Sequence, residues 1–399
     1  MESSETRSWT TNLDGIPALR LTTTPTPSPS TLSPTQILVK ILAVSLNYKD
    51  AEIISGLFKH HKSSVAPPNL IPCADSVGIV VATGRPSTQG PDATTTTSQP
   101  WKPGDRVLSL SYPKYLTGPA LPTYLAAGVG SATHGCLTTH RVFSADAVLP
   151  CPPHLSASEA ACLPIAGTTA WMGLTWSLPL GIPAAPSQIT SPRAGQTLLV
   201  QGTGGVSIFG LLLGKAMGMR VLVTSSSDDK LARARALGAD AGINYAATPA
   251  WDEEVLRLTE GEGADVIFEN GGAGSTDKSF RCVRFGGQIA AIGYVGGKVD
   301  RLAGKADDHE DRLNINVLAL ARNVTLKGLL NGPRDRMEDM LAFVAEQKIR
   351  PVVDRVFAFE DAREALTYLW EGKHFGKVVI KVADEQMENL DSKGGIAGH

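Results

Sequence analysis

A glycine-rich turn between two apolar runs constrains the fold of this chain more than any other feature. The run Thr197–Val200 leads into the turn, and a helical pattern then continues to Met217. A second apolar run, Arg220–Thr224, completes a strand–helix–strand unit. Such a turn lets the backbone approach a pyrophosphate, which the free N–H groups at the start of the helix can bind. The residues predicted to contact a dinucleotide here are Gly202, Thr203, Gly204, Gly205 and Val206.

The third position of this fingerprint is usually Gly or Ala, and here it is Ser207. Serine is still small enough for close packing of the helix against the strand. Because a strand precedes the turn and a helix and a second strand follow it, we expect a doubly wound parallel sheet. An ordinary glycine-rich turn of an α/β domain is the alternative.

The end of the second strand predicts which dinucleotide binds. An NAD site usually places Asp or Glu about 20 residues after the glycines, on the ribose 2′-OH. This chain has Ser225 and Ser226 at that place, and Lys230 follows. Hydroxyl groups and a positive charge suit a 2′-phosphate, so NADPH is the expected cofactor. The nearby Asp228 and Asp229 keep NADH as the alternative.

Length and charge limit the class of protein. With 399 residues, the chain is long enough for two domains with sizeable cores. The net charge of −2 gives no reason to expect a nucleic acid or an anionic membrane as a partner. No apolar run reaches the length of a membrane span. The five cysteines contain no CxxC pair, so we expect reduced thiols in a cytoplasmic protein that acts on a small molecule.

The pattern of elements divides the chain into two kinds of domain. Short strands bounded by turns come first, and a capping box at Ser156 and Glu159 then opens a series of alternating helices and strands. The predicted fold class is therefore α/β, a β-rich domain joined to a doubly wound sheet. The expected strands of the β-rich domain are Ile37–Leu46, Ile79–Ala82, Arg106–Leu110 and 139–150. A further strand at Val378–Val382 is expected near the end of the chain.

Two later strands are predicted to end at the cofactor groove, since ligands of a doubly wound sheet bind outside the carboxyl ends of its strands. Asn270 follows the expected strand Ala264–Phe268, and Gly293 and Tyr294 follow Gln288–Ile292. We expect these three residues to line the groove. Plain turn chemistry is the alternative for each of them.

Several short motifs, taken together and in order, resemble the medium-chain dehydrogenase/reductase superfamily, in its quinone-reductase-like branch. They include Asn47-Tyr48-Lys49-Asp50, Asp75-Ser76-Val77-Gly78, Gly104-Asp105-Arg106-Val107 and Gly376-Lys377-Val378-Val379. The resemblance covers about residues 15–385. It implies a GroES-like substrate domain over 1–160, a Rossmann domain over 161–324, and a return to the substrate domain over 325–399. It also implies an active site between the domains and a homodimer formed near residues 285–300.

The zinc-dependent members of this superfamily hold a catalytic zinc with Cys, His and Cys. The motifs place those ligands at Asn47, Ala74 and Ile165. None of these is a thiolate, an imidazole or a carboxylate, which zinc prefers. The four-cysteine lobe of a structural zinc is also absent from the sequence. The resemblance therefore implies a zinc-independent member without a metal site.

The residues beside the lost ligand position are the candidates for catalysis. Tyr48 can hydrogen-bond a developing enolate or deliver a proton, and Lys49 can add positive charge. Asn47 can bond the substrate or the nicotinamide ribose. A packed aromatic ring and a solvated lysine are the alternatives, and Asp50 is expected to anchor a buried turn. His60 and His61 are expected at the surface.

The resemblance also implies cofactor contacts away from the glycine-rich turn. They are Thr169 near the nicotinamide, Tyr245 beside the cofactor, and Lys373 and Phe375 on the segment that approaches the cleft.

The expected function is that of a zinc-independent, NADPH-dependent oxidoreductase. It would transfer hydride to the C=C bond of an α,β-unsaturated carbonyl, or to a quinone. Two alternatives stay open: a metal-free alcohol/carbonyl oxidoreductase, and an NADPH-binding protein that has lost turnover.

Overall fold

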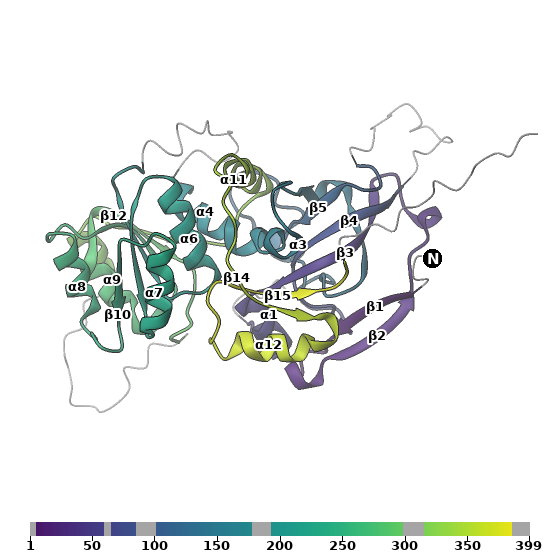
Figure 1. Cartoon of the computed structure of the whole chain (residues 1–399), viewed down its shortest axis with the longest axis horizontal. Helices are drawn as coiled ribbons and strands as arrows, with labels where there is room; N and C mark the ends of the chain where they lie inside the picture. The colour runs from purple at the N-terminus through teal and green to yellow at the C-terminus, as the bar shows by residue number, and fades with distance from the viewer. Residues whose placement is uncertain (1–4, 60–64, 85–100, 178–192, 298–314, 385–399) are drawn as a thin grey trace, which may run out of the picture.

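The computed structural model describes residues 5–59, 65–84, 101–177, 193–297 and 315–384. Within them, two domains lie side by side, each built around its own sheet (Figure 1). Among these residues, no helix has the length and apolar character that crossing a membrane requires. His60 and His61 fall outside the described residues.

The Rossmann domain contains a six-stranded sheet in the order β10-β9-β8-β11-β12-β13, and every pairing in it is parallel. This is the 3-2-1-4-5-6 order of a dinucleotide-binding sheet. The predicted doubly wound fold is therefore confirmed. Its strands are β8 (Thr197–Gln201), β9 (Arg220–Ser225), β10 (Ala241–Asn244), β11 (Ala264–Glu269), β12 (Val283–Ala291) and β13 (Thr325–Gly328).

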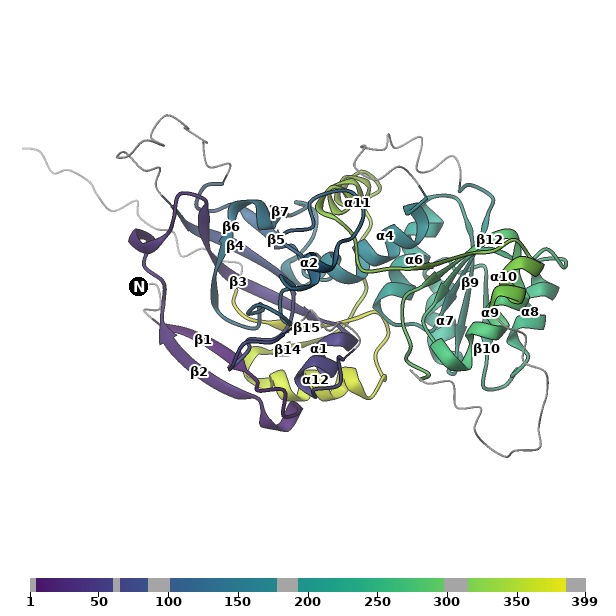
Figure 2. The same cartoon turned by 180° about the vertical axis from the view of Figure 1, so that it is seen from behind.

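Helices cover both faces of this sheet because its strand residues alternate between two apolar clusters. Leu198 and Val200 of β8 pack with Phe209 on one face, whereas Leu199 packs with Trp251 on the other. Figure 2 shows α8, α9 and α10 next to the sheet. The helices of the domain are α4 (Thr168–Thr175), α6 (Gly205–Ala216), α7 (Asp228–Ala236), α8 (Trp251–Leu258), α9 (Thr276–Cys282) and α10 (Ile315–Ala321).

The β-rich domain contains a seven-stranded sheet with the path β14-β15-β3-β4-β5-β7, and β6 pairs with β3. Its strands are β3 (Gln36–Leu46), β4 (Asp75–Thr83), β5 (Arg106–Ser109), β6 (His140–Ser144), β7 (Val148–Pro150), β14 (Val353–Ala358) and β15 (Lys377–Lys381). A separate hairpin, β1 (Glu5–Thr10) and β2 (Arg20–Pro25), lies beside it. The remaining helices are α1 (Tyr48–Ile54), α2 (Pro122–Leu125), α3 (Ala157–Ala160), α11 (Arg334–Glu346) and α12 (Ala362–Trp370).

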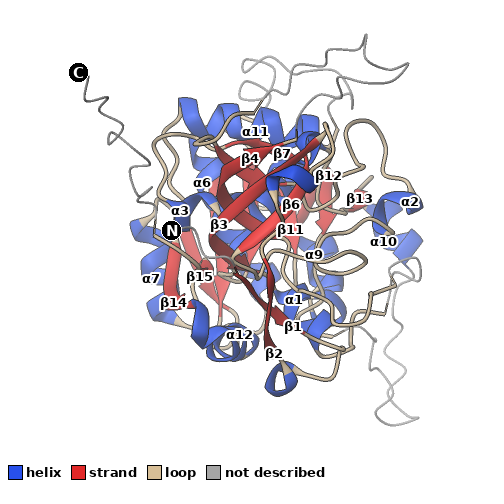
Figure 3. Ribbon diagram, turned by 90° about the vertical axis from the view of Figure 1, so that its right-hand side faces the viewer, coloured by secondary structure: helices blue, strands red, loops and turns tan. Residues whose placement is uncertain are grey.

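The last two strands of the chain complete the sheet of the β-rich domain. β14 and β15 run parallel side by side (Figure 3), and β15 pairs antiparallel with β3.

Two details differ from the sequence prediction. β13 belongs to the Rossmann sheet, so that sheet extends to Gly328 rather than ending at 324. The strand expected over 139–150 is two strands, because a 3-10 turn at Ala145–Ala147 separates β6 from β7.

The predicted capping box at the start of α3 is present. The Ser156 hydroxyl accepts a hydrogen bond from the Glu159 N–H at 3.3 Å, and the Glu159 carboxylate accepts one from the Ser156 N–H at 2.9 Å. After α3, a π-helical turn at Leu163–Gly167 leads into α4. This short segment carries the chain from the β-rich sheet into the Rossmann domain.

Candidate active site

The glycine-rich turn joins β8 to α6 and leaves the start of α6 open. Gly202 has φ +74°, a conformation that favours glycine, and a Cβ there would meet no described atom within 4 Å. Gly204 is the N-cap of α6, and no described side chain caps the helix. Backbone N–H groups at such an end are orphan donors that suit a phosphate. The turn therefore fits the pyrophosphate of a dinucleotide.

The departure from the fingerprint at Ser207 has a structural reason. The Ser207 hydroxyl donates a hydrogen bond to the Gln201 carbonyl at 2.7 Å. It accepts one from the Asn270 side-chain amide at 3.0 Å, and this amide also reaches the Gln201 carbonyl at 3.2 Å. Serine thus ties the glycine-rich turn to the residue after β11, which a glycine or an alanine cannot do. The amide of Asn270 is committed to this contact.

The end of β9 presents a small polar surface. Ser225 is only 4% exposed, and its hydroxyl accepts a hydrogen bond from the Ser227 N–H at 3.2 Å, whereas Ser226 is exposed. The Lys230 ammonium donates to the Gly372 carbonyl at 2.9 Å, and burial lowers its pKa. Tyr245 has an exposed ring, and its N–H donates to the Ser225 carbonyl at 3.0 Å. The charge of Lys230 and the serine hydroxyls therefore lie at one strand end.

The returning segment 372–377 lies against the glycine-rich turn. The Gly376 N–H donates to the Thr203 carbonyl at 2.9 Å, and Gly376 forms a bridge with Gly204. Lys373 is exposed and forms an ion pair with Glu371 at 2.9 Å.

Phe375 does not lie on a cleft surface. It is 1% exposed within the main core, and the Arg233 guanidinium stacks 4.2 Å from its ring centre. In this structure its ring is covered by the protein, so the expected cofactor contact is not available to it. The apolar side chain is instead used for packing in the core.

His374 faces the turn and is largely buried. Its Nε2 would lie 4.0 Å from a Cβ at Gly204, and its Nδ1 has no hydrogen-bond partner among the described atoms. Burial, with smaller effects of Lys230 and Lys377, lowers the pKa of His374 from 6.5 to about 4. The folded protein therefore favours the neutral imidazole.

This shift predicts acid sensitivity. In the unfolded chain His374 takes up a proton near pH 6.5, but in the folded protein only near pH 4, so stability is lost as the pH falls through that window. The free energy of unfolding of the wild type should fall between pH 7 and pH 5. In His374→Gln, which lacks the titrating imidazole, we expect this fall to be roughly 2 kcal/mol smaller. Urea unfolding of both proteins at the two pH values measures the difference. Equal acid sensitivity would contradict this environment for His374.

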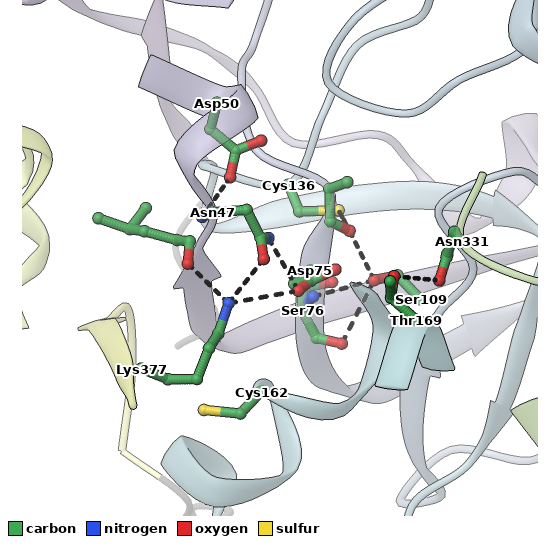
Figure 4. A network of polar contacts seen from close by, with 12 residues as sticks. Asn47, Asp50, Asp75, Ser76, Ser109, Cys136, Cys162, Thr169, Asn331 and Lys377 are labelled. Atoms are coloured by element: carbon green, nitrogen blue, oxygen red, sulfur yellow. Dashed lines mark hydrogen bonds and ion pairs between the residues drawn. The ribbon is translucent and has the colours of Figure 1, made fainter. Parts of the chain in front are cut away.

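A buried polar network lies beside the start of α1 (Figure 4). The Lys377 ammonium donates hydrogen bonds to the Leu46 carbonyl at 2.6 Å and to Asn47 Oδ1 at 2.7 Å. The Asn47 amide donates to Asp75 Oδ2 at 2.9 Å, and Lys377 Nζ lies 3.9 Å from the same oxygen. Burial raises the pKa of Asp75 to about 6, although Lys377 and Asn47 oppose this. Lys377 and Asp75 belong to two of the motifs named above, but nothing in those motifs indicates that the two side chains meet.

Asn47 also begins α1. Its N–H donates to Asp50 Oδ2 at 2.8 Å, as part of a capping box, and Asp50 is fully buried. The expectation that Asp50 anchors a buried turn is confirmed. Burial raises the pKa of Asp50 even though Lys49, Asn47 and Lys377 lower it.

The residues at the zinc-ligand positions of the superfamily do not fit a zinc ion. The amide of Asn47 is bonded to Lys377 and Asp75, and Ala74 and Ile165 have no donor atom. The Lys377 ammonium beside Asn47 opposes a second cation. Among the described residues, no three His, Cys, Asp or Glu side chains are grouped so that they can hold a metal ion. Burial raises the pKa of the nearby Cys162 to about 12, which keeps its thiol neutral.

Tyr48 is the first residue of α1 and is half-buried. Its ring stacks on Trp370 of α12, with centres 5.1 Å apart and planes at 5°. Burial, followed by the nearby Glu52, raises the pKa of the Tyr48 phenol. The next residue, Lys49, has its ammonium 5.4 Å from the centre of the Tyr112 ring. Tyr48 thus has a fixed ring plane and a phenol that stays protonated.

A hydrogen bond joins α1 to the Rossmann domain. The Tyr294 hydroxyl, from the loop after β12, donates to Glu52 Oε2 at 2.7 Å. Glu52 is buried and lies one helical turn after Tyr48, which places both on one face of α1. Burial and the Glu52 carboxylate raise the pKa of Tyr294, and Tyr48 contributes. The structure therefore brings the predicted residues Tyr48 and Tyr294 together through Glu52, which sequence reasoning missed.

Hydrogen bonds fix Thr169 and Gly293 within the Rossmann domain. Thr169, in α4, is buried, and its hydroxyl donates to Asn331 Oδ1 at 3.4 Å. Gly293 N–H donates to the Glu269 carbonyl at 3.1 Å, so its turn is fixed to the end of β11. Asn331 has φ +44° and was not singled out in the sequence.

A cavity of the β-rich domain lies away from these residues. It has a volume of about 1010 Å³ and is lined by residues that include Trp101, Pro150, Cys151, Arg334 and Leu341. None of the predicted site residues lines it. The chemistry described above therefore does not belong to this cavity.

Comparisons with known proteins agree with this architecture. The family model "Alcohol dehydrogenase GroES-like domain" matches residues 33–153, and the model "Zinc-binding dehydrogenase" matches residues 205–346. A zinc-type alcohol dehydrogenase-like protein of Schizosaccharomyces pombe is 35% identical over 89% of this chain and 93% of its own length. A chloroplastic quinone oxidoreductase of Triphysaria versicolor is 26% identical over 92% of this chain and 95% of its own length.

A solved structure shares the whole arrangement. The putative alcohol dehydrogenase of Sinorhizobium meliloti has a TM-score of 0.77 and 34% identity, and the match covers 96% of this chain and all of that one. The similarity thus extends over both domains and the returning segment. The chain therefore belongs to the medium-chain dehydrogenase/reductase superfamily of oxidoreductases, with a GroES-like and a Rossmann domain and relatives in the quinone-reductase-like branch.

Proposed function

We propose that the chain is a zinc-independent, NADPH-dependent reductase. It transfers hydride to the C=C bond of an α,β-unsaturated carbonyl, or to a quinone. The observation that carries the proposal is the Lys377–Asn47–Asp75 network, which occupies Asn47, one of the three positions at which the resemblance places a zinc ligand. Without a Lewis acid to polarise an alcohol, acceptors that are already activated are the suitable substrates. The quinone oxidoreductase among the relatives supports this class of acceptor.

The glycine-rich turn and the N-terminus of α6 hold the pyrophosphate in this proposal. Ser225, Ser226 and Lys230 hold the 2′-phosphate, for which hydroxyl groups and an ammonium are suitable partners. In the same proposal, Thr169, Asn270, Gly293 and Tyr294 contribute to the nicotinamide end of the groove. The bound nicotinamide supplies the hydride.

Tyr48 completes the reduction. Hydride adds to the β-carbon of the acceptor, the C=C electron pair moves toward the carbonyl, and negative charge develops on oxygen. The Tyr48 phenol donates a hydrogen bond to that oxygen and supplies a proton, which ends on the α-carbon. Stacking on Trp370 fixes the direction of the phenol. Lys49, the next residue of α1, adds positive charge to the site.

A metal-free alcohol/carbonyl oxidoreductase is the second candidate, because two of the similar proteins are named as alcohol dehydrogenases or as like them. A panel of acceptors separates the two. NADPH oxidation should be fastest with enones or quinones, and slow with saturated aldehydes. Fast turnover with saturated aldehydes or alcohols alone would favour the second candidate. No turnover with any of them would leave a cofactor-binding protein.

The zinc-ligand positions predict the metal content. The purified protein should hold far less than one equivalent of zinc, and a chelator should leave its activity unchanged. The reason is that Asn47, Ala74 and Ile165 offer none of the ligands that zinc prefers. Elemental analysis of the protein, before and after dialysis against the chelator, gives the answer. One equivalent of tightly held zinc would overturn this part of the proposal.

A further inference from the structure

Lys377 connects the two halves of the candidate site. It is the first residue of β15, directly after Gly376, whose N–H bonds the Thr203 carbonyl of the glycine-rich turn. Its stem packs beneath that turn, since a Cβ at Gly205 would lie 2.6 Å from Lys377 Cδ. There is no free space between the turn and this side chain. A displacement of Gly205 toward this side chain would therefore push against Lys377 Cδ.

The other end of the side chain holds the start of α1. Its ammonium bonds the Leu46 carbonyl at 2.6 Å and Asn47 Oδ1 at 2.7 Å, one residue before Tyr48 (Figure 4). Lys377 is 3% exposed, and a buried ammonium is unfavourable unless oxygen atoms surround it. Apolar side chains packed at such a place often stabilise a protein as well as a buried ion pair does, or better. The buried ammonium is therefore weak evidence that Lys377 serves stability alone.

We propose that Lys377 is a positioning residue that couples the dinucleotide-binding turn to α1. Its stem packs against the turn at Gly205, and its ammonium fixes Asn47, which is at a zinc-ligand position of the superfamily. Asn47 begins α1, so Lys377 sets the position of Tyr48. This inference rests on the proposed function, because the proposed catalytic role of Tyr48 is the reason why its position matters. Its test, however, does not depend on turnover.

The test is hydrogen exchange measured by mass spectrometry, with and without NADPH. In the wild type we expect NADPH to slow exchange in two peptides, one over the turn at 202–212 and one over α1 at 48–56. In Lys377→Met, which keeps a stem but lacks the ammonium, the turn should stay protected and the α1 peptide should lose its protection. Lys381→Met is the matched control, since Lys381 is on the same strand but exposed. It should behave as the wild type.

Lys377→Met leaves Asp75 buried without its cation, and the loss of one partner of a buried ion pair destabilises a fold by itself. Lys377→Met combined with Asp75→Asn removes both charges, and the amide at 75 can still accept from Asn47. The folded double variant should also lose protection at α1, whereas Asp75→Asn alone should keep it. Protection of α1 that persists in the folded lysine variants would overturn the coupling.

The outcomes separate this inference from the proposed function. If NADPH protects the turn but not α1 in the wild type, only the coupling fails. If NADPH protects neither peptide, the coupling and the choice of cofactor both fail. If protection follows the expected pattern while no acceptor is reduced, the coupling stands and the proposed reaction fails.

Discussion

Replacing Tyr48 with phenylalanine is expected to lower the single-turnover rate of NADPH oxidation by about 30- to 1000-fold. This corresponds to roughly 2–4 kcal/mol of lost transition-state stabilisation. Phenylalanine keeps the ring and therefore the stack on Trp370, so the variant tests the hydroxyl alone. The affinity for NADPH should stay unchanged, because Tyr48 lies on the substrate domain and away from the glycine-rich turn.

Single-turnover measurement with a saturating acceptor is needed, because slow product release can hide a defect in the chemical step. Tyr124→Phe is the matched control. Tyr124 stacks on Tyr115 at 4.8 Å in the same domain, and it has no part in the proposed reaction. If Tyr48→Phe changes the rate by less than about threefold, Tyr48 fills the cleft wall and water is the proton donor.

The wild type is expected to bind NADPH at least tenfold more tightly than NADH, and Ser225→Asp should reverse this preference. A tenfold preference needs about 1.4 kcal/mol, which one or two hydrogen bonds to a phosphate can supply. Ser225 accepts from the Ser227 N–H, and an aspartate can accept the same bond. The substitution therefore adds a carboxylate at the end of β9 that repels a 2′-phosphate.

Ser225→Asn is the control for that substitution, because it has nearly the shape of aspartate without the charge. It should weaken NADPH binding much less than Ser225→Asp does. Fluorescence titration of the three proteins with both cofactors measures these preferences. Equal curves for NADPH and NADH, before and after the substitution, would contradict the role of this strand end.

The Rossmann sheet was predictable because its signals are local. The glycine-rich turn, the apolar runs and the helical pattern between them follow one another directly in the sequence, and β8 and β9 begin at the predicted residues. The boundary at 324 was less certain from the sequence. β13 is a short strand in the last position of the sheet, and nothing local shows which of the two sheets it joins.

The contacts within the site were not predictable in the same way. Lys377 and Asn47 are 330 residues apart, and Tyr294 and Glu52 are 242 apart. Only the folded chain shows that these side chains meet. The motif Gly376-Lys377 marked the segment, and the spacing of Glu52 from Tyr48 suits one helix face, but neither signal names a partner.

Phe375 illustrates the opposite error. Its segment does approach the glycine-rich turn, as expected, but the ring lies in the core under Arg233. The neighbouring His374 faces the turn instead. Resemblance placed the segment correctly, but it did not establish which of its side chains points toward the turn.

The most direct test of the proposed reaction follows the hydride into the product. The metal-depleted protein is supplied with NADPH that carries deuterium at the transferable position of the nicotinamide, and with an α,β-unsaturated ketone as the acceptor. We expect a saturated ketone with deuterium on the β-carbon, formed at the same rate with and without added zinc. An allylic alcohol with deuterium on the former carbonyl carbon, or a reaction that needs zinc, would contradict it.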